Sequence, residues 1–108
     1  MSDTQSVINK LAILKEKYIK SLPDKLTDIY MEWSSYKEAN NLKDQKLASH
    51  LHKLAGSAGM YELFELGETA RAIELNIINF EGELSDDFIK TIEDDLLKLK
   101  TMVADLHQ

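Results

Sequence analysis

Apolar residues recur every three or four positions along almost the whole chain of 108 residues. At about 100° per residue, this spacing places them on one face of a helix. The alternating apolar and polar pattern of a β-strand is not convincing in any segment. The spacing therefore predicts an all-α protein with helices at roughly residues 4–20, 23–38, 43–59, 62–79 and 85–106.

The breaks between these helices are predicted from residues that start or stop them. Pro23 predicts a break or bend, because proline is best tolerated in the first turn of a helix. Asn41 or Asp44 could cap the third helix, and Ser85 is a good N-cap for the last. Four long amphipathic helices joined by short loops predict an antiparallel four-helix bundle. The first helix, with one face formed by Val7, Leu11, Leu14 and Tyr18, is expected to cap or flank that bundle.

Composition narrows the class of protein. A chain of 108 residues is long enough for one domain with one core, so residues 1–108 are expected to form a single domain. The absence of cysteine excludes disulfides, thiolate catalysis and zinc–thiolate sites. No signal peptide and no run near the ~20 apolar residues of a membrane span is present, which favours a cytoplasmic protein without a membrane partner. A net charge of −6 argues against nucleic acid as a partner.

The helix expected at residues 43–59 contains two glycines, Gly56 and Gly59. Each glycine inside a helix lowers helix stability by roughly 1 kcal/mol relative to alanine. Two glycines in one helix therefore indicate that side chains at these positions would interfere with something. On a helical wheel, His52 lies about 120° from the apolar stripe and so faces solvent. Its neighbours one and two turns away are small: Ala48, Ser49, Ala55, Gly56 and Gly59. Another macromolecule could therefore approach this imidazole closely.

Residues 52–59 (HKLAGSAG) resemble the motif of the histidine-containing phosphotransfer (HPt) domain, His-x-Leu-(Lys or Ala)-Gly-Ser-Ala. The resemblance extends to residues 22–26 and 66–74, and so covers about residues 20–75. It implies a helical bundle in which His52 is the phosphoryl acceptor. It also implies that a receiver domain supplies the aspartyl phosphate and the Mg²⁺, so that this chain is a carrier, not an enzyme, and needs no cofactor of its own.

The partners implied by the resemblance are response-regulator receiver domains and a hybrid sensor histidine kinase, and a monomer is the simpler expectation. Many family members carry lysine three residues after the histidine, where this chain has Ala55, and Lys53 is the cation nearest in sequence. Many also have glycine where this chain has Glu62, so the following turn is expected to differ. Candidate positions for access or docking are Gln45, Lys46, Ala48, Ser49, Lys53, Ala55, Gly56 and Gly59.

Three other interpretations remain open from sequence. The protein could be an interaction module with the same fold that binds a receiver domain, or another partner, without transferring phosphate. His52 could be an ordinary surface histidine, with Gly56 and Gly59 present for close helix packing. An enzyme is the least favoured class, because no nucleotide-binding glycine loop and no acid at helical spacing from His52 are found. His50 is expected to be a partly buried structural residue, and no metal site is expected from it or from His107.

Overall fold

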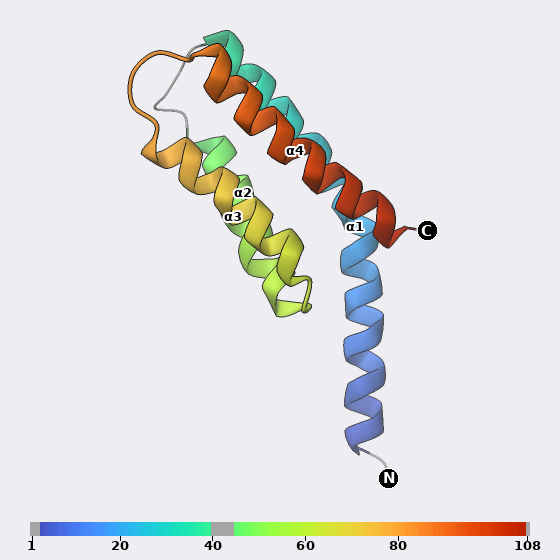
Figure 1. Cartoon of the computed structure of the whole chain (residues 1–108). Coiled ribbons are helices and arrows are strands. Elements are labelled where there is room, and N and C mark those ends of the chain that lie inside the picture. Colours follow the sequence, from blue (N-terminus) through green and yellow to red (C-terminus); the bar gives the residue numbers. More distant parts are fainter. Residues whose placement is uncertain (1–2, 40–44, 108) are drawn as a thin grey trace.

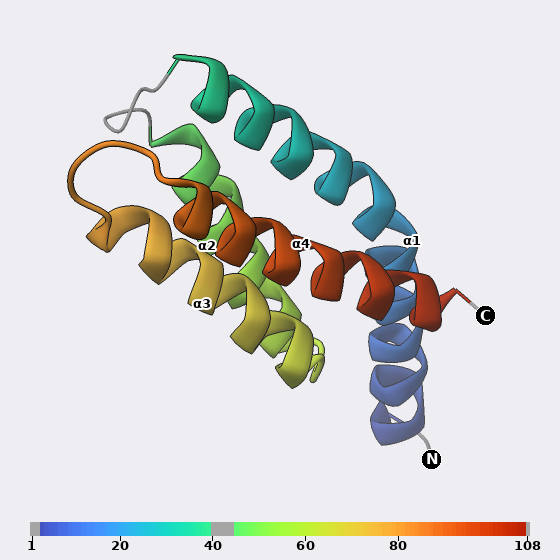
Figure 2. The ribbon, with the colours of Figure 1, turned by 45° about the horizontal axis from the view of Figure 1, so that its top comes forward.

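The computed structural model describes residues 3–39 and 45–107, and this part of the chain forms four α-helices and no β-strand. The helices are α1 (Asp3–Ala39), α2 (Lys46–Met60), α3 (Phe64–Asn79) and α4 (Asp86–Leu106), and they pack as a helical bundle (Figures 1 and 2). Within the described residues, no helix has the length and apolar character needed to cross a membrane. The expected caps Asn41 and Asp44, and the first two residues of the helix expected at 43–59, lie outside the described residues.

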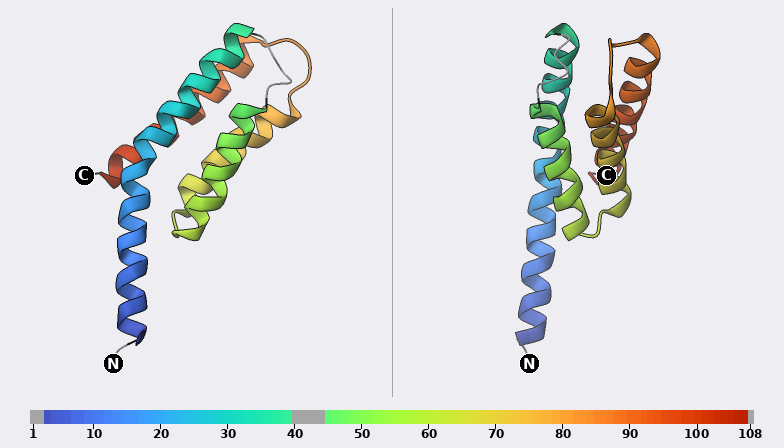
Figure 3. Two further views of the ribbon diagram at one scale, coloured as in Figure 1. Left: turned by 180° about the vertical axis from the view of Figure 1, so that it is seen from behind. Right: turned by 90° about the vertical axis from the view of Figure 1, so that its left-hand side faces the viewer.

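The expected break at Pro23 is absent, and one helix, α1, replaces the two helices predicted at residues 4–20 and 23–38. Proline inside a helix removes one backbone hydrogen bond and clashes with the preceding turn, which bends a helix without necessarily ending it. Figures 1 and 3 show that α1 changes direction along its length. Leu22 and Leu26 on either side of Pro23 are buried, and their burial offsets the lost hydrogen bond.

The first half of α1 does not cap or flank the bundle as a separate helix. Residues 5–17, here called the N-terminal arm, extend beyond the end of the bundle (Figures 1 and 3). The expected inward face of this arm is exposed: Val7, Leu11 and Leu14 have 47–56% of their surface in solvent. Tyr18 is the first residue of that face to pack against the core. The periodicity correctly predicted a helix but wrongly predicted a neighbour for it.

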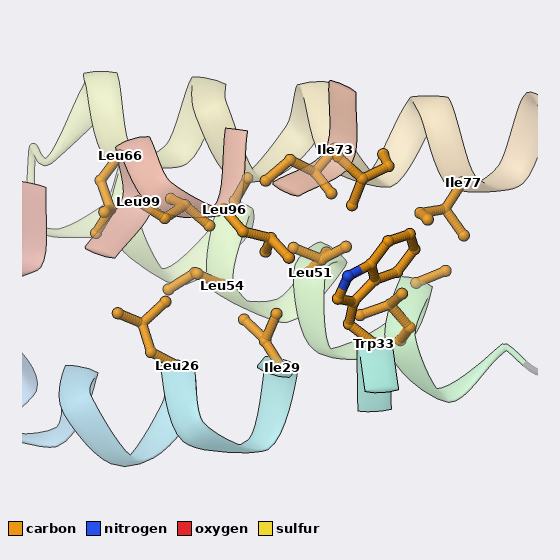
Figure 4. Close-up of a cluster of buried hydrophobic side chains, with 14 of the residues drawn as sticks. Leu26, Ile29, Trp33, Leu51, Leu54, Leu66, Ile73, Ile77, Leu96 and Leu99 are labelled. Atoms are coloured by element: carbon orange, nitrogen blue, oxygen red, sulfur yellow. The ribbon is translucent and has the colours of Figure 1, made fainter. Parts of the chain in front are cut away.

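The core lies between the second half of α1 and the other three helices (Figure 4). Trp33, only 1% exposed, is its largest buried side chain. Its indole Nε1 donates a hydrogen bond to Glu93 Oε2 on α4 at 3.0 Å. Lys37 Nζ contacts the same oxygen at 2.7 Å and lies over the indole ring. The other buried apolar residues are Leu22, Leu26, Ile29, Tyr36, Leu47, Ala48, Leu51, Leu54, Ala58, Leu66, Ala70, Ile73, Ile77, Ile92, Leu96, Leu99 and Val103.

The helices α2 and α3 lie side by side in every view (Figures 1, 2 and 3). Gly67 of α3 sets their separation, because a Cβ there would lie 3.1 Å from the carbonyl oxygen of Ala55 on α2. Residues 61–63 connect the two helices, and Glu62 adopts a left-handed conformation with φ 63°. Its backbone N–H donates to the carbonyl of Gly59. A glycine would adopt this conformation without the steric cost that glutamate carries here.

The start of α4 is fixed by the residue predicted to cap it. Ser85 is the N-cap, and its hydroxyl accepts a hydrogen bond from the backbone N–H of Phe88 at 3.1 Å. Asp86 and Asp87 follow in the first turn, where carboxylates interact favourably with the helix dipole. Phe88 also stacks on Phe80, at 4.0 Å between ring centroids, which joins the end of α3 to the start of α4.

Candidate functional site

His52 projects from α2 with 70% of its side chain exposed, and it contacts a carboxylate on α3. Its Nδ1 lies 2.9 Å from Oε2 of Glu74. An ionised carboxylate can only accept a hydrogen bond, so the geometry places the ring proton on Nδ1. In the neutral imidazole, Nε2 then keeps its lone pair. The ring is therefore held in one orientation with a nucleophilic nitrogen free.

Glu74 is the one charged residue that is buried among the described residues, at 8% exposure. Its second oxygen, Oε1, is buried and has no hydrogen-bond partner in the described structure. Burying a carboxylate is costly unless a partner compensates it, so the pairing with His52 is a built feature of the site.

Glu74 is a site residue that the sequence pattern did not predict, because no acid lies one or two turns from His52 on its own helix. The carboxylate comes from the next helix, 22 residues away in sequence. A usable signal was present: Glu74 directly follows Ile73 and lies one turn from Ala70 and Ile77, all of them buried. A carboxylate at the edge of a buried helical face is usually paired with a hydrogen-bond donor or a cation.

Two hollows adjoin His52, one on each side. The first, about 380 Å³, is lined by Glu74 and by Gln45, Ala48 and Ser49 from the start of α2. The second, about 290 Å³ and here called the glycine hollow, is lined by His52, Ala55, Gly56, Gly59, Phe64, Gly67, Glu68 and Arg71. The structure thus brings six of the candidate positions, Gln45, Ala48, Ser49, Ala55, Gly56 and Gly59, to the surroundings of His52. Ala48 is itself buried in the core.

The two glycines of α2 are not needed for packing among the residues that the structure describes. A Cβ built at Gly56 or at Gly59 would meet none of the other described residues within 4 Å. Gly67 on α3 is the glycine that permits the close helix contact. The interpretation that Gly56 and Gly59 serve internal helix packing is therefore wrong, and the space beside His52 is open to the outside.

The structure does not bring Lys53 into either hollow beside His52. It lines a different one, with Tyr18 and Lys25 of α1 and with His50, which is partly buried as expected. Lys46 is exposed in the first turn of α2. The cation nearest to His52 in sequence is therefore turned toward α1, away from the Glu74 side of the ring.

Ser57, the serine of the motif, joins α2 to α1. Its hydroxyl donates to the carbonyl of Lys53 at 2.8 Å, and Tyr18 Oη, 2.6 Å away, is then the donor to Ser57. Tyr18 also stacks on Tyr61, with ring centroids 4.6 Å apart. Burial raises the pKa of the Tyr18 hydroxyl, the Ser57 hydrogen bond partly opposes this, and nearby Tyr61 adds to it. Tyr18 therefore stays neutral at physiological pH, as its donor role requires.

The Hpt domain family model matches residues 14–108. Because this match covers nearly the whole chain, the protein belongs to the Hpt domain family, whose members are phosphocarriers of phosphorelays and interact with receiver domains. Searches of curated proteins and of solved structures found no match. In the described part of the chain, no three His, Asp or Glu side chains are grouped as metal ligands.

Proposed function

We propose that this protein is a histidine phosphotransfer carrier: His52 accepts a phosphoryl group from the aspartyl phosphate of one receiver domain and passes it to another. The protein acts as a single-domain, monomeric, antiparallel bundle in the cytoplasm. A hybrid sensor histidine kinase is the expected upstream partner. The observation that carries the proposal is the exposed His52, fixed by Glu74 and flanked by two glycines whose absent side chains serve no internal contact.

The transfer step balances with the groups described. Nε2 of His52 attacks the phosphorus atom, the N–P bond forms and the P–O bond of the aspartyl phosphate breaks, and the electron pair returns to the receiver's carboxylate. The imidazole that retains its Nδ1 proton becomes positively charged. The Glu74 carboxylate, 2.9 Å from Nδ1, stabilises that charge in both directions of transfer.

Mg²⁺ belongs to the receiver's site in this scheme, where it neutralises charge on the phosphoryl oxygens. The carrier contributes an oriented nucleophile and a surface on which the partner can dock. Gln45, Ser49 and Gly56, which are exposed, and Ala55 and Gly59, which are partly exposed, form the surface proposed for docking. Without side chains at residues 56 and 59, the partner's backbone can approach the reacting atoms.

The direct test is transfer of ³²P from a panel of charged receiver domains to this protein, with His52→Gln in parallel. Acid-labile, base-stable label on the wild type and none on the variant is expected. The glutamine amide can still donate a hydrogen bond to the buried Glu74 carboxylate, so the variant should lose little stability, and urea denaturation checks that it is folded. Receiver binding by both proteins, without label on either, would instead show a non-transferring interaction module.

The role of the open surface has its own test. Gly56→Leu is expected to fold without loss of stability, because leucine is the better helix former by nearly 1 kcal/mol and a Cβ at this exposed position meets no described atom within 4 Å. It should nevertheless slow transfer by about tenfold or more, since the side chain occupies the approach path. Ala72→Leu, on an exposed position of α3, is the matched control and should leave transfer unchanged. Unchanged transfer by Gly56→Leu would contradict the proposed docking surface.

The role of Glu74 is tested by Glu74→Gln. The amide can keep a hydrogen bond to His52 but carries no charge, so we expect slower transfer and a changed balance between the two neutral tautomers. Nitrogen-15 NMR of the imidazole measures that balance directly. A wild-type tautomer ratio in this variant, together with slower transfer, would show that Glu74 acts through structure alone.

A further inference from the structure

The glycine hollow contains one cationic side chain, Arg71 of α3. Arg71 is exposed, and it forms no hydrogen bond or ion pair with any residue of the described structure. The hollow is otherwise formed mainly by small residues of α2 and α3, and His52 lies at its edge. An unpaired guanidinium next to an open space and a nucleophilic histidine is suited to binding an anion.

The position of Arg71 is fixed by its neighbours on α3. It lies one turn before Glu74, which contacts His52, and one turn after Gly67, which contacts the backbone of α2. Both of these residues tie α3 closely to α2, so the Cα of Arg71 is held beside the His52 segment. Arg71 and His52 line the same hollow, so the long arginine side chain and the imidazole border one open space.

We propose that Arg71 binds the phosphoryl oxygens of phosphorylated His52, with the glycine hollow as the site of the phosphoryl group. This inference rests on the proposed function. Ala55 stands where many family members carry lysine, so α2 itself supplies no cation on this side of His52. The positive charge comes from the neighbouring helix instead. The guanidinium can donate two parallel hydrogen bonds to phosphoryl oxygens, which an ammonium group does less well.

The positions of Glu74 and Lys53 bear on which side of His52 the phosphoryl group occupies. The Glu74 carboxylate lines the opposite hollow and would repel phosphoryl oxygens placed there. Glu68 lines the glycine hollow with Arg71, and its negative charge partly offsets the attraction of Arg71 for an anion. Lys53 lines a separate hollow toward α1 and does not share the site.

The test uses phosphoramidate to phosphorylate the full chain, so that no receiver domain is needed. The probe is the ³¹P resonance of the phosphohistidine, identified by its loss in His52→Gln and titrated against pH. A guanidinium close to the phosphoryl group favours its dianion, so Arg71→Gln should raise the titration midpoint. Lys53→Gln removes the same charge from a neighbouring residue and should move the midpoint much less. Equal shifts in the two variants, or none in Arg71→Gln, would overturn the proposal.

Receiver-dependent transfer gives a second readout. Arg71→Gln should slow transfer about tenfold, the effect expected for one partly exposed charge-assisted contact, and its unfolding midpoint should stay unchanged. Adding Ala55→Lys to Arg71→Gln should restore part of the rate, because it returns a cation to the same hollow. A wild-type protein that is phosphorylated by phosphoramidate but by no receiver would refute the transfer function while leaving the Arg71 titration readable. Transfer by Arg71→Gln at the wild-type rate would contradict the Arg71 assignment alone.

Discussion

The two halves of α1 carry the same apolar spacing but end in different surroundings. In the second half, Leu22, Leu26, Ile29, Trp33 and Tyr36 are all no more than 6% exposed. In the N-terminal arm, Val7, Leu11 and Leu14 repeat the spacing and remain about half exposed. A row of apolar residues at helical spacing therefore indicates that a helix can form and can bury one face. Whether the face is buried depends on the helices that lie beside it, and most of the arm projects beyond the other helices (Figures 1 and 3).

The largest expected effect that tests this comparison is Trp33→Ala. Truncating this fully buried side chain should cost about 3–5 kcal/mol in the free energy of unfolding, because it leaves a large cavity among four helices. Urea denaturation followed by circular dichroism measures the loss. A cost below about 1 kcal/mol would mean that the second half of α1 contributes little to the core.

A smaller effect is expected where α1 contacts α4 at Glu93. Glu93→Ala should cost about 1–2 kcal/mol, because it leaves the buried Trp33 N–H without its acceptor. Glu93→Gln keeps an acceptor oxygen and should cost less than about 1 kcal/mol, since nearly half of the Glu93 side chain is exposed. Equal costs for the two variants would show that the charge, and not the hydrogen bond to Trp33, is what matters.

The same contact predicts a pH dependence. The hydrogen bonds from Lys37 and from Trp33 lower the pKa of Glu93 below its ordinary value of 4.5. The unfolded chain therefore binds this proton at a higher pH than the folded chain does. The stabilisation is fully present above the ordinary pKa and is lost as the pH falls through the lowered one. The stability difference between wild type and Glu93→Gln should thus be constant near neutral pH and shrink in acid, as urea titrations at several pH values can show.

At the junction between the two halves, Tyr18→Phe should cost about 1 kcal/mol. The variant loses the hydrogen bond to Ser57 but keeps the ring stacked on Tyr61. Ser57 keeps its own bond to the carbonyl of Lys53, so no donor is left buried and unpaired. An unchanged thermal unfolding midpoint would show that the Tyr18 hydroxyl does not stabilise the fold, and that the stabilising contacts of α1 begin after Tyr18.

The smallest effect is expected in the arm. Leu11→Ala should change stability by less than about 0.5 kcal/mol, because the side chain is more than half exposed and the replacement is a better helix former. Measured beside Trp33→Ala, it compares the two halves directly. A loss of 2 kcal/mol or more, on the order of a buried leucine, would show that the arm is covered in the folded protein.

Local patterns predicted where helices form and that His52 is exposed, but they did not predict which helices pack together or which residue contacts His52. Ser85 was identifiable as a cap because the signal lies within four residues of the bond it makes. Pro23 was misread because its cost is local, whereas the burial of Leu22 and Leu26 that offsets it comes from other helices. Glu74 was missed for the same reason, since its contact with His52 crosses from one helix to the next.

The distinction between the glycines also required the structure. In sequence, Gly56, Gly59 and Gly67 are alike in standing inside helices. Only Gly67 faces a neighbouring backbone, whereas Gly56 and Gly59 face open space. The packing of α3 on α2 decides which glycine is needed for the fold and which are available to a partner.

The pairing of α2 with α3 has a consequence for folding. His52, Glu74, Arg71 and the three glycines around them all lie on two helices joined by a three-residue turn. Contacts between segments close in sequence form rapidly, because a short loop loses little entropy on closing. We therefore expect the shape of the site to depend mainly on this helical hairpin, with α1 and α4 stabilising its folded state. Destabilising changes in those two helices should lower the amount of active protein while leaving the reactivity of each folded molecule intact.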